Sequence, residues 1–260
     1  MKWTVLVFSF LLMACGETTP PMPEVTGEEL IEQKSSEKQE VKPVVNDGFP
    51  RLNNTNVEEF LLEYGKSHPQ TRIRIKSDFG DIEIELFEDT PLHRANFVYL
   101  INRGYYTPTE VIRVIKGFMI QGGNSEEEGP AADRMLIGSY CLPAEMGMNH
   151  VHHRGALAMS RNYNDNPDKC SSAYDFYIVQ GTKYKGVHVF KAEQEKGIKY
   201  NDIQKQKYKS AGGAIHLDME HTVFGHVVKG MNVIDEIAKV EVDGSNWPKK
   251  LVQLSMEVVQ

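Results

Sequence analysis

The sequence lacks the features that mark several specialised classes of protein. Its three cysteines are too few for a disulfide framework, and none of its apolar runs reaches the roughly 20 residues that span a bilayer. Acidic residues number 36 against 29 basic ones, and a formal net charge of −7 argues against nucleic-acid binding, because phosphate contacts need a basic surface. What remains is a globular composition, 40% hydrophobic and 25% charged.

The common catalytic and cofactor motifs are also missing. The chain contains no G-x-S-x-G, no phosphate-binding glycine loop, no H-E-x-x-H and no C-x-x-C. A cluster of His150, His152 and His153 could ligate a metal, but no carboxylate or cysteine accompanies it at a recognised spacing. We therefore expect no cofactor and no metal. Cys141 and Cys170 could pair in an oxidising compartment or remain free thiols, and their spacing does not decide between the two.

The N-terminus has the pattern of an export signal. Lys2 precedes a mostly apolar run over residues 3–14, which is too short to span a bilayer but typical of a signal peptide. The run ends in Leu12-Met13-Ala14-Cys15-Gly16, which is similar to the lipobox of bacterial lipoproteins. That resemblance implies cleavage before Cys15 and lipid attachment to its thiol, so we expect a lipid-anchored protein of the cell envelope, facing the periplasm or the cell surface. An ordinary signal peptide with an incidental cysteine is the alternative.

The chain then divides into a tether and a folded part. Residues 17–45 contain seven Glu, three Lys and four Pro but no Phe, Trp or Tyr, so they cannot bury enough apolar surface to offset the entropy of ordering. We predict a signal peptide over 1–14, a lipidated cysteine with a flexible tether over 15–54, a helical extension over 55–70 and the main domain over 71–260. Thr55 and Glu58 fit a capping box at the start of the extension.

Alternating and helical patterns predict a mostly-β domain. Ile73 and Ile75 alternate with basic residues, and Ile82, Ile84 and Leu86 alternate with acidic ones after a turn, which predicts a hairpin with one buried face. Further strands are predicted at 111–115, 118–121, 156–159, 176–179, 223–228 and 252–259, and helices at 91–103, 202–209 and 231–239. Many short strands with few helices favour a sandwich or a barrel.

One segment carries the most specific signal. The run Val111-Ile-Arg-Val-Ile-Lys-Gly-Phe-Met-Ile-Gln-Gly-Gly-Asn124 places a basic side chain, two large apolar ones and an amide on a short strand pair beside a glycine turn. It resembles the signature of the cyclophilin family of peptidyl-prolyl isomerases, and the resemblance extends from about Thr71 to Val259. Further matching blocks follow in order: Gly155-Ala-Leu-Ala-Met-Ser160, Asp175-Phe-Tyr-Ile178 and His221-Thr-Val-Phe-Gly-His-Val227. The resemblance implies a closed eight-stranded antiparallel barrel capped by two helices.

The resemblance also implies a site and an activity. Arg113 would be the catalytic residue, donating to the prolyl nitrogen of a twisted X–Pro bond without a covalent step. The substrate-binding residues would be Phe118, Met119, Tyr177 and Leu217 around the proline ring, Gln121 and His221 at the substrate backbone and the pocket edge, and Ser160 and Asp175 beside them. We expect a monomer that acts on proline-containing polypeptides and assists the folding of exported proteins.

Four positions depart from the family pattern. Asp175 stands where most members have Gln, and its carboxylate could pair with Arg113 and compete with catalysis. Tyr177 replaces Phe, Arg161 replaces Asn, and His216 replaces Trp, which puts cyclosporin sensitivity in question. The alternative function is therefore a weakly active or inactive module that binds proline-containing segments.

Residues 183–214 form an insertion relative to many family members, between the pocket residues Tyr177 and His216. Because the insertion is tethered beside the pocket, it could shape access to it or contact the residues that flank the proline. A surface decoration remote from the groove is the other interpretation. The sequence does not name the client proteins.

Overall fold

The computed structural model describes residues 48–124 and 128–259. The predicted signal peptide, Cys15 and most of the predicted tether lie outside these residues. Within the described ranges, no helix combines the length and the apolar character needed to cross a membrane.

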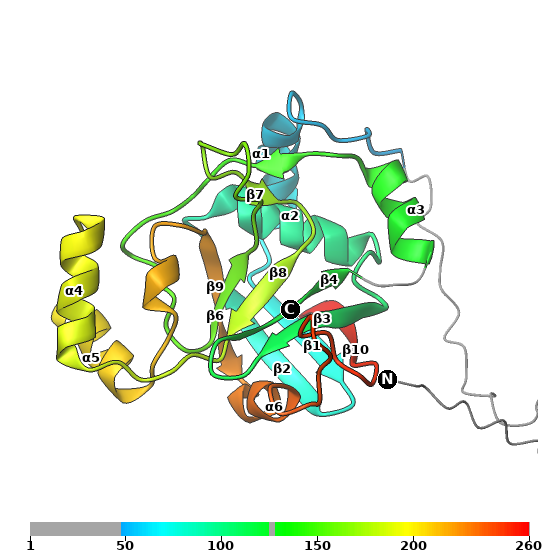
Figure 1. The fold of residues 1–260 in the computed structure, drawn as a ribbon. Helices are drawn as coiled ribbons and strands as arrows, with labels where there is room; N and C mark the ends of the chain where they lie inside the picture. The colour runs from blue at the N-terminus through cyan, green and yellow to red at the C-terminus, as the bar shows by residue number, and fades with distance from the viewer. Residues whose placement is uncertain (1–47, 125–127, 260) are drawn as a thin grey trace, which may run out of the picture. The chain divides into compact units, whose positions relative to one another are not determined.

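Eight strands form a closed antiparallel barrel. They are β1 (Arg72–Ser77), β2 (Gly80–Leu86), β3 (Thr109–Ile115), β4 (Met119–Asn124), β6 (Ala156–Met159), β8 (Phe176–Val179), β9 (Val223–Lys229) and β10 (Gln253–Val259). Their order around the barrel is β1-β10-β3-β4-β8-β6-β9-β2, and β2 pairs with β1 to close it (Figure 1). The predicted eight-stranded barrel is confirmed.

The β1–β2 hairpin shows how the sequence specifies this barrel. Ile73 lies opposite Ile84, and both side chains are buried in the core. On the other face Arg72 lies opposite Glu85, with their charged groups 3.3 Å apart. A slip of one residue would expose the isoleucines, each of which contributes about 1.5–3 kcal/mol when buried, so the alternation fixes the register.

Helices lie at the two ends of the barrel. α2 (Pro91–Asn102) and α6 (Met231–Ile237) close opposite ends, as predicted, and α1 (Val57–Ser67) packs on α2 (Figure 1). The predicted capping box at the start of α1 is wrong. The Thr55 hydroxyl donates to Asn53 Oδ1 at 2.6 Å, and the residue before the helix, Asn56, makes no side-chain capping bond. Packing against α2, rather than a cap, therefore holds α1.

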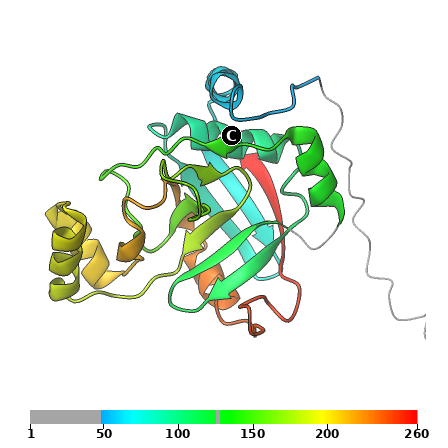
Figure 2. The ribbon, with the colours of Figure 1, turned by 45° about the horizontal axis from the view of Figure 1, so that its top comes forward.

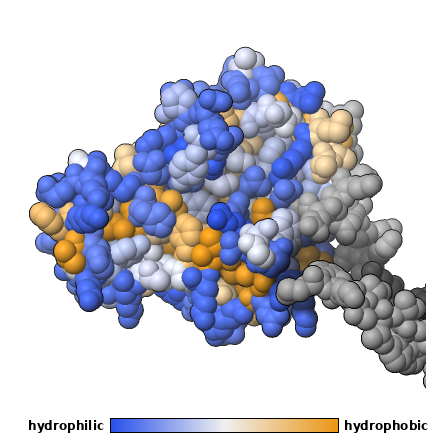
Figure 3. All heavy atoms as spheres, in the orientation of Figure 1, coloured by the Kyte–Doolittle hydropathy of each residue, from blue (hydrophilic) through white to orange (hydrophobic). Residues whose placement is uncertain are grey.

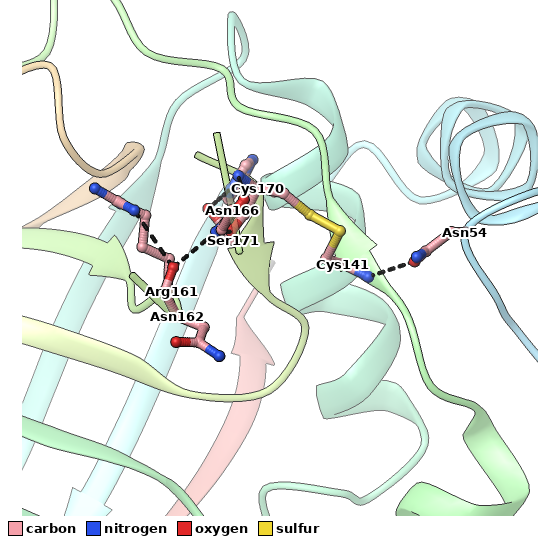
Figure 4. The surroundings of a disulfide bond; sticks show 8 residues. Asn54, Cys141, Arg161, Asn162, Asn166, Cys170 and Ser171 are labelled. Atoms are coloured by element: carbon pink, nitrogen blue, oxygen red, sulfur yellow. Dashed lines mark hydrogen bonds between the residues drawn. A yellow bond between two sulfur atoms is a disulfide. The ribbon is translucent and has the colours of Figure 1, made fainter. Parts of the chain in front are cut away.

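Three short elements that the sequence did not predict lie next to α2. They are α3 (Glu128–Ile137), β5 (Cys141–Leu142) and β7 (Ser171–Ser172), and β5 pairs with β7. A disulfide joins Cys141 to Cys170, whose Cα atoms are 5.7 Å apart, and so answers the question that their spacing left open (Figure 4). The Asn54 side chain accepts a hydrogen bond from the Cys141 backbone N–H at 2.9 Å and ties this region to the chain before α1.

The 183–214 segment folds into two helices that lie side by side and project from the barrel (Figures 1 and 2). These are α4 (Gly186–Lys196), which was not predicted, and α5 (Asp202–Ser210), which was; the 3-10 turn η1 (Ile215–Leu217) follows them. The segment shares a small apolar core with the loop before β6 and with η1, formed by Val151, Val189, Ala192, Tyr200, Tyr208 and Ile215. It is therefore a packed unit joined to the barrel surface.

Candidate active site

Four neighbouring strands place a row of side chains on the face of the sheet that points away from the barrel core. Arg113 of β3 is paired with Gln121 of β4, Gln121 with Tyr177 of β8, and Tyr177 with Ala158 of β6. Side chains alternate between the two faces of a strand, so neighbours of these residues such as Val114, Ile120 and Ile178 point into the core. Residues far apart in the sequence thus become neighbours on one surface.

A pocket of about 600 Å³ lies over this row. It is lined by Arg113, Phe118, Met119, Gln121, Ser160, Arg161, Asn162, Tyr163, Ser172, Asp175, Tyr177, His216, Leu217 and His221. The structure therefore brings together all nine of the described residues predicted for the site. Three further lining residues, Asn162, Tyr163 and Ser172, were not predicted, and the only signal for them was their closeness in sequence to predicted residues.

The floor of the pocket is apolar and well packed. Met119, Tyr177 and Leu217 are almost fully buried and belong to an apolar cluster on this outer face, separate from the barrel core. The Phe118 ring is half-buried beside them, with its centre 5.0 Å from that of the exposed His216 ring. Figure 3 shows apolar surface gathered between the barrel and the α4–α5 projection, framed by hydrophilic residues. Such a floor suits a small apolar ring.

Arg113 stands at the edge of this floor. Its side chain is exposed, and within the described part of the chain it makes no hydrogen bond or ion pair. The pairing with Asp175 that the sequence left open does not form. Asp175 instead accepts hydrogen bonds from Arg134 of α3 at 3.2 Å and from the Ser172 hydroxyl at 3.0 Å. The guanidinium of Arg113 therefore keeps its five N–H donors available to a ligand.

His221 lies in the pocket as a neutral ring. Burial lowers its pKa to about 4, so at neutral pH one ring nitrogen carries hydrogen and the other accepts. Nδ1 lies 3.1 Å from the Met159 carbonyl, to which it can only donate, and Nε2 therefore accepts from the Tyr163 hydroxyl at 2.7 Å. Both nitrogens are thus occupied, and His221 holds Tyr163 at the pocket rim.

The positive charge of Arg161, which stands where the family has Asn, is neutralised by Glu220. Arg161 donates to Glu220 Oε2 at 2.9 Å and to the Glu220 carbonyl at 2.7 Å, and its side chain is nearly buried. Its guanidinium lies 4.0 Å from the centre of the Tyr163 ring. Arg161 therefore supports the pocket rim, while Arg113 is the cation that faces the pocket without a partner among the described residues.

The three clustered histidines contact different partners. His150 Nε2 lies 2.6 Å from Asp89 Oδ1, while His152 Nδ1 lies 2.9 Å from Asp218 Oδ1. His153 Nε2 lies 3.2 Å from a backbone carbonyl of α5. Across residues 48–124 and 128–259, no three His, Cys, Asp or Glu side chains converge as a metal site would require.

A second hollow, of about 720 Å³, lies beside the disulfide. It is bordered by α1 and by the loop over residues 162–170, and Asn and Asp side chains form much of its lining. No Lys or Arg lines it, and neither does any of the predicted site residues. The smaller pocket over β3, β4 and β8 is therefore the candidate site.

Comparison with known families agrees with this geometry. The family model described as "Cyclophilin type peptidyl-prolyl cis-trans isomerase/CLD" matches residues 71–258, which contain the barrel except for the last residue of β10. The chain belongs to this cyclophilin family. The match spans every residue of the candidate pocket, so the family assignment and the pocket rest on the same part of the chain.

Relatives of this cyclophilin include both short and long proteins. A protein of Streptococcus pyogenes serotype M6, whose name pairs a phosphatase with a peptidyl-prolyl cis-trans isomerase, is 35% identical over 71% of this chain but only 38% of its own length. A "Peptidyl-prolyl cis-trans isomerase" of Acinetobacter baylyi is 30% identical over 75% of this chain and 88% of its own length. The chain thus spans little more than a third of the first relative and most of the second.

A solved structure has the same fold. The crystal structure of a cyclophilin-type peptidyl-prolyl cis-trans isomerase from Cryptosporidium parvum, in the presence of the dipeptide Ala-Pro, superposes with a TM-score of 0.52 at 21% identity. The alignment covers 73% of this chain and 99% of that one. At this identity the likeness establishes the cyclophilin barrel and carries no conclusion about substrates.

Proposed function

We propose that this chain catalyses the cis–trans isomerisation of X–Pro peptide bonds, with Arg113 as the catalytic residue. The observation that carries the proposal is the exposed Arg113 guanidinium, which has no partner among residues 48–124 and 128–259, at the edge of a buried apolar floor made by Met119, Tyr177 and Leu217. The floor would receive the proline ring, and Gln121, paired with Arg113 across β3 and β4, would contact the peptide backbone.

The chemistry needs no nucleophile and no cofactor. Rotation about the C–N bond faces a barrier of about 18–20 kcal/mol because the planar amide is stabilised by resonance. When the bond twists, the prolyl nitrogen regains a lone pair, and a guanidinium beside it binds the twisted state better than either planar isomer. Shortening the uncatalysed exchange from about 10–100 s to milliseconds requires roughly 5.5 kcal/mol, a magnitude within reach of a charged hydrogen bond together with desolvation.

A protease-coupled assay on a proline-containing peptide tests this activity. We expect Arg113→Ala to lower kcat/KM by about 10²–10³-fold, the usual effect of removing one donor aimed at the transition state. Lys116→Ala is the matched control, because Lys116 is an exposed cation in the same hairpin that does not line the pocket. Undetectable acceleration by the parent protein, with measurable peptide binding, would favour the alternative of a module that binds proline segments.

We also propose that the protein is exported, anchored through a lipid on Cys15 and active on exported polypeptides in the cell envelope. The lipobox-like run before Cys15 supports this part of the proposal. Metabolic labelling with a radioactive fatty acid tests it. The full chain should carry label and sediment with membranes, and the Cys15→Ser variant should do neither; an unlabelled full chain would refute the anchor.

A further inference from the structure

The Tyr177 side chain has two environments. Its ring forms part of the pocket floor, while its hydroxyl lies 2.9 Å from Nε2 of the buried His152. A phenylalanine would serve the ring's role alone. The hydroxyl therefore connects the pocket floor to the groups behind it.

Asp218 determines which nitrogen of His152 accepts the hydrogen bond from the Tyr177 hydroxyl. One carboxylate oxygen, Oδ1, lies 2.9 Å from His152 Nδ1 and also accepts the His152 backbone N–H at 2.7 Å. In the neutral ring, Nδ1 carries the hydrogen and donates to the carboxylate, which leaves Nε2 to accept from Tyr177. The carboxylate thus fixes both the tautomer and the orientation of the ring behind the pocket.

The other carboxylate oxygen is held by the α4–α5 segment. Oδ2 accepts from the Tyr200 hydroxyl at 2.7 Å and from the Tyr208 hydroxyl at 2.5 Å, and all three side chains are buried. Burial, and then the neighbouring carboxylate, raises the pKa of both tyrosines, so both remain protonated donors. The buried Asp218 therefore has four donors, two of them from the segment over 183–214.

A second contact runs from the same segment to the pocket wall. Lys196, the last residue of α4, donates its Nζ hydrogens to the carbonyls of His216 and Asp218 at 3.0 and 2.9 Å. These two residues flank Leu217, which lies in the pocket floor. The segment thus contacts the pocket floor in two ways: its tyrosines bind Asp218 behind Tyr177, and Lys196 binds the backbone of η1 and Asp218 on either side of Leu217.

We propose that Tyr200 and Tyr208 are positioning residues for the proline pocket, acting on Tyr177 through Asp218 and His152. The inference rests on the proposed isomerase function. It gives the 183–214 segment a role other than shaping access to the pocket or decorating a remote surface. It does not require α4 or α5 to touch the substrate.

The test compares Tyr200→Phe and Tyr208→Phe with Tyr184→Phe. Tyr184 belongs to the same segment and packs against the same apolar core, but its hydroxyl is not one of the four donors to Asp218, so its variant loses one hydroxyl and keeps those hydrogen bonds. We expect the two test variants to raise KM by about 3–10-fold, the effect of losing one net hydrogen bond. Their kcat should change little, because the floor grips the proline in planar and twisted states alike. The control should resemble the parent.

A double-mutant cycle traces the route. In a Tyr177→Phe background, Tyr208→Phe should raise KM by less than it does in the parent, because the hydroxyl that transmits the effect is already gone. Full additivity would overturn the proposed path through Tyr177.

Methyl NMR of Met119 and Leu217 in the free protein provides a readout that needs no turnover. Their resonances should move in Tyr200→Phe and Tyr208→Phe and stay in place in Tyr184→Phe. Unchanged KM and unchanged methyl resonances in the folded test variants would overturn the inference. A parent protein without isomerase activity would refute the proposed function instead, and the methyl resonances would still decide whether these tyrosines position the pocket.

Discussion

Removing the disulfide should cost a large part of the stability of this protein. Cys141 and Cys170 are 29 residues apart, and their bond restricts that length of chain in the unfolded state. Loop-closure entropy for a loop of this size corresponds to about 3.6 kcal/mol at 25 °C. For a domain of this size, the loss should lower Tm by roughly 7–14 °C.

The same change should leave the pocket intact in the folded protein. The loop that leads from the pocket to Cys170 is held by Asn166, whose side chain donates to the carbonyls of Asn162 and Cys170, both at 2.8 Å (Figure 4). Asn166 also accepts the Cys170 backbone N–H at 2.9 Å. These bonds do not depend on the sulfur atoms, so we expect the disulfide to stabilise the fold without shaping the site.

Urea unfolding of the parent and of the Cys141→Ser/Cys170→Ser variant measures the effect, each with and without a reductant. The reductant should lower the free energy of unfolding of the parent to the value of the variant and should not affect the variant. Below the unfolding transition, kcat/KM of the two proteins should be the same. Equal stability of the oxidised parent and the variant would refute the entropic argument, and a loss of activity in the folded variant would refute the independence of the site.

Two further predictions follow from the charged groups around the pocket. Burial lowers the pKa of His221 from 6.5 to about 4, so the folded protein holds the neutral ring. The stability that this contributes is fully present above pH 6.5 and is lost as the pH falls towards 4. Urea unfolding should show about 2–3 kcal/mol of stability lost over that range. The His221→Gln variant should not show this loss, and a variant with the pH profile of the parent would contradict its attribution to His221. Arg134→Ala should lower stability by about 1–3 kcal/mol, because it removes the cationic partner of the half-buried Asp175 carboxylate and leaves only the Ser172 hydroxyl beside it. It should also lower kcat/KM, because that carboxylate shares the pocket with Arg113. Arg134→Lys should restore part of both in unfolding and peptide assays, and an Arg134→Ala variant with parental kcat/KM would show that Asp175 does not compete for Arg113.

The β1–β2 hairpin could be predicted from the residues alone because its signal is local. Alternation in β1 and β2 gives each strand a buried face, and the run over 111–124 carries a basic group and its apolar neighbours on one hairpin. These patterns predicted a sandwich or a barrel. The closed barrel, and the placement of Tyr177 beside Gln121 in one pocket, came from the resemblance to cyclophilins.

The rest depends on contacts between residues that no local pattern connects. Arg134 meets Asp175 from a helix 41 residues away, and His152 meets Asp218 across 66 residues. α4 was missed because its apolar residues lie on two faces: Val189 is buried, while Val187 and Phe190 share an exposed face. Such partners become visible only when the fold places them together.

The central claim is that Arg113 accelerates the twist of an X–Pro bond held on an apolar floor. Two-dimensional exchange NMR on a peptide that contains Ala-Pro tests this most directly, because it measures affinity and exchange rate separately for the parent and for Arg113→Gln. The variant should bind the peptide about as tightly as the parent and should lose at least about 10²-fold in exchange rate. Exchange by Arg113→Gln as fast as by the parent would contradict the claim.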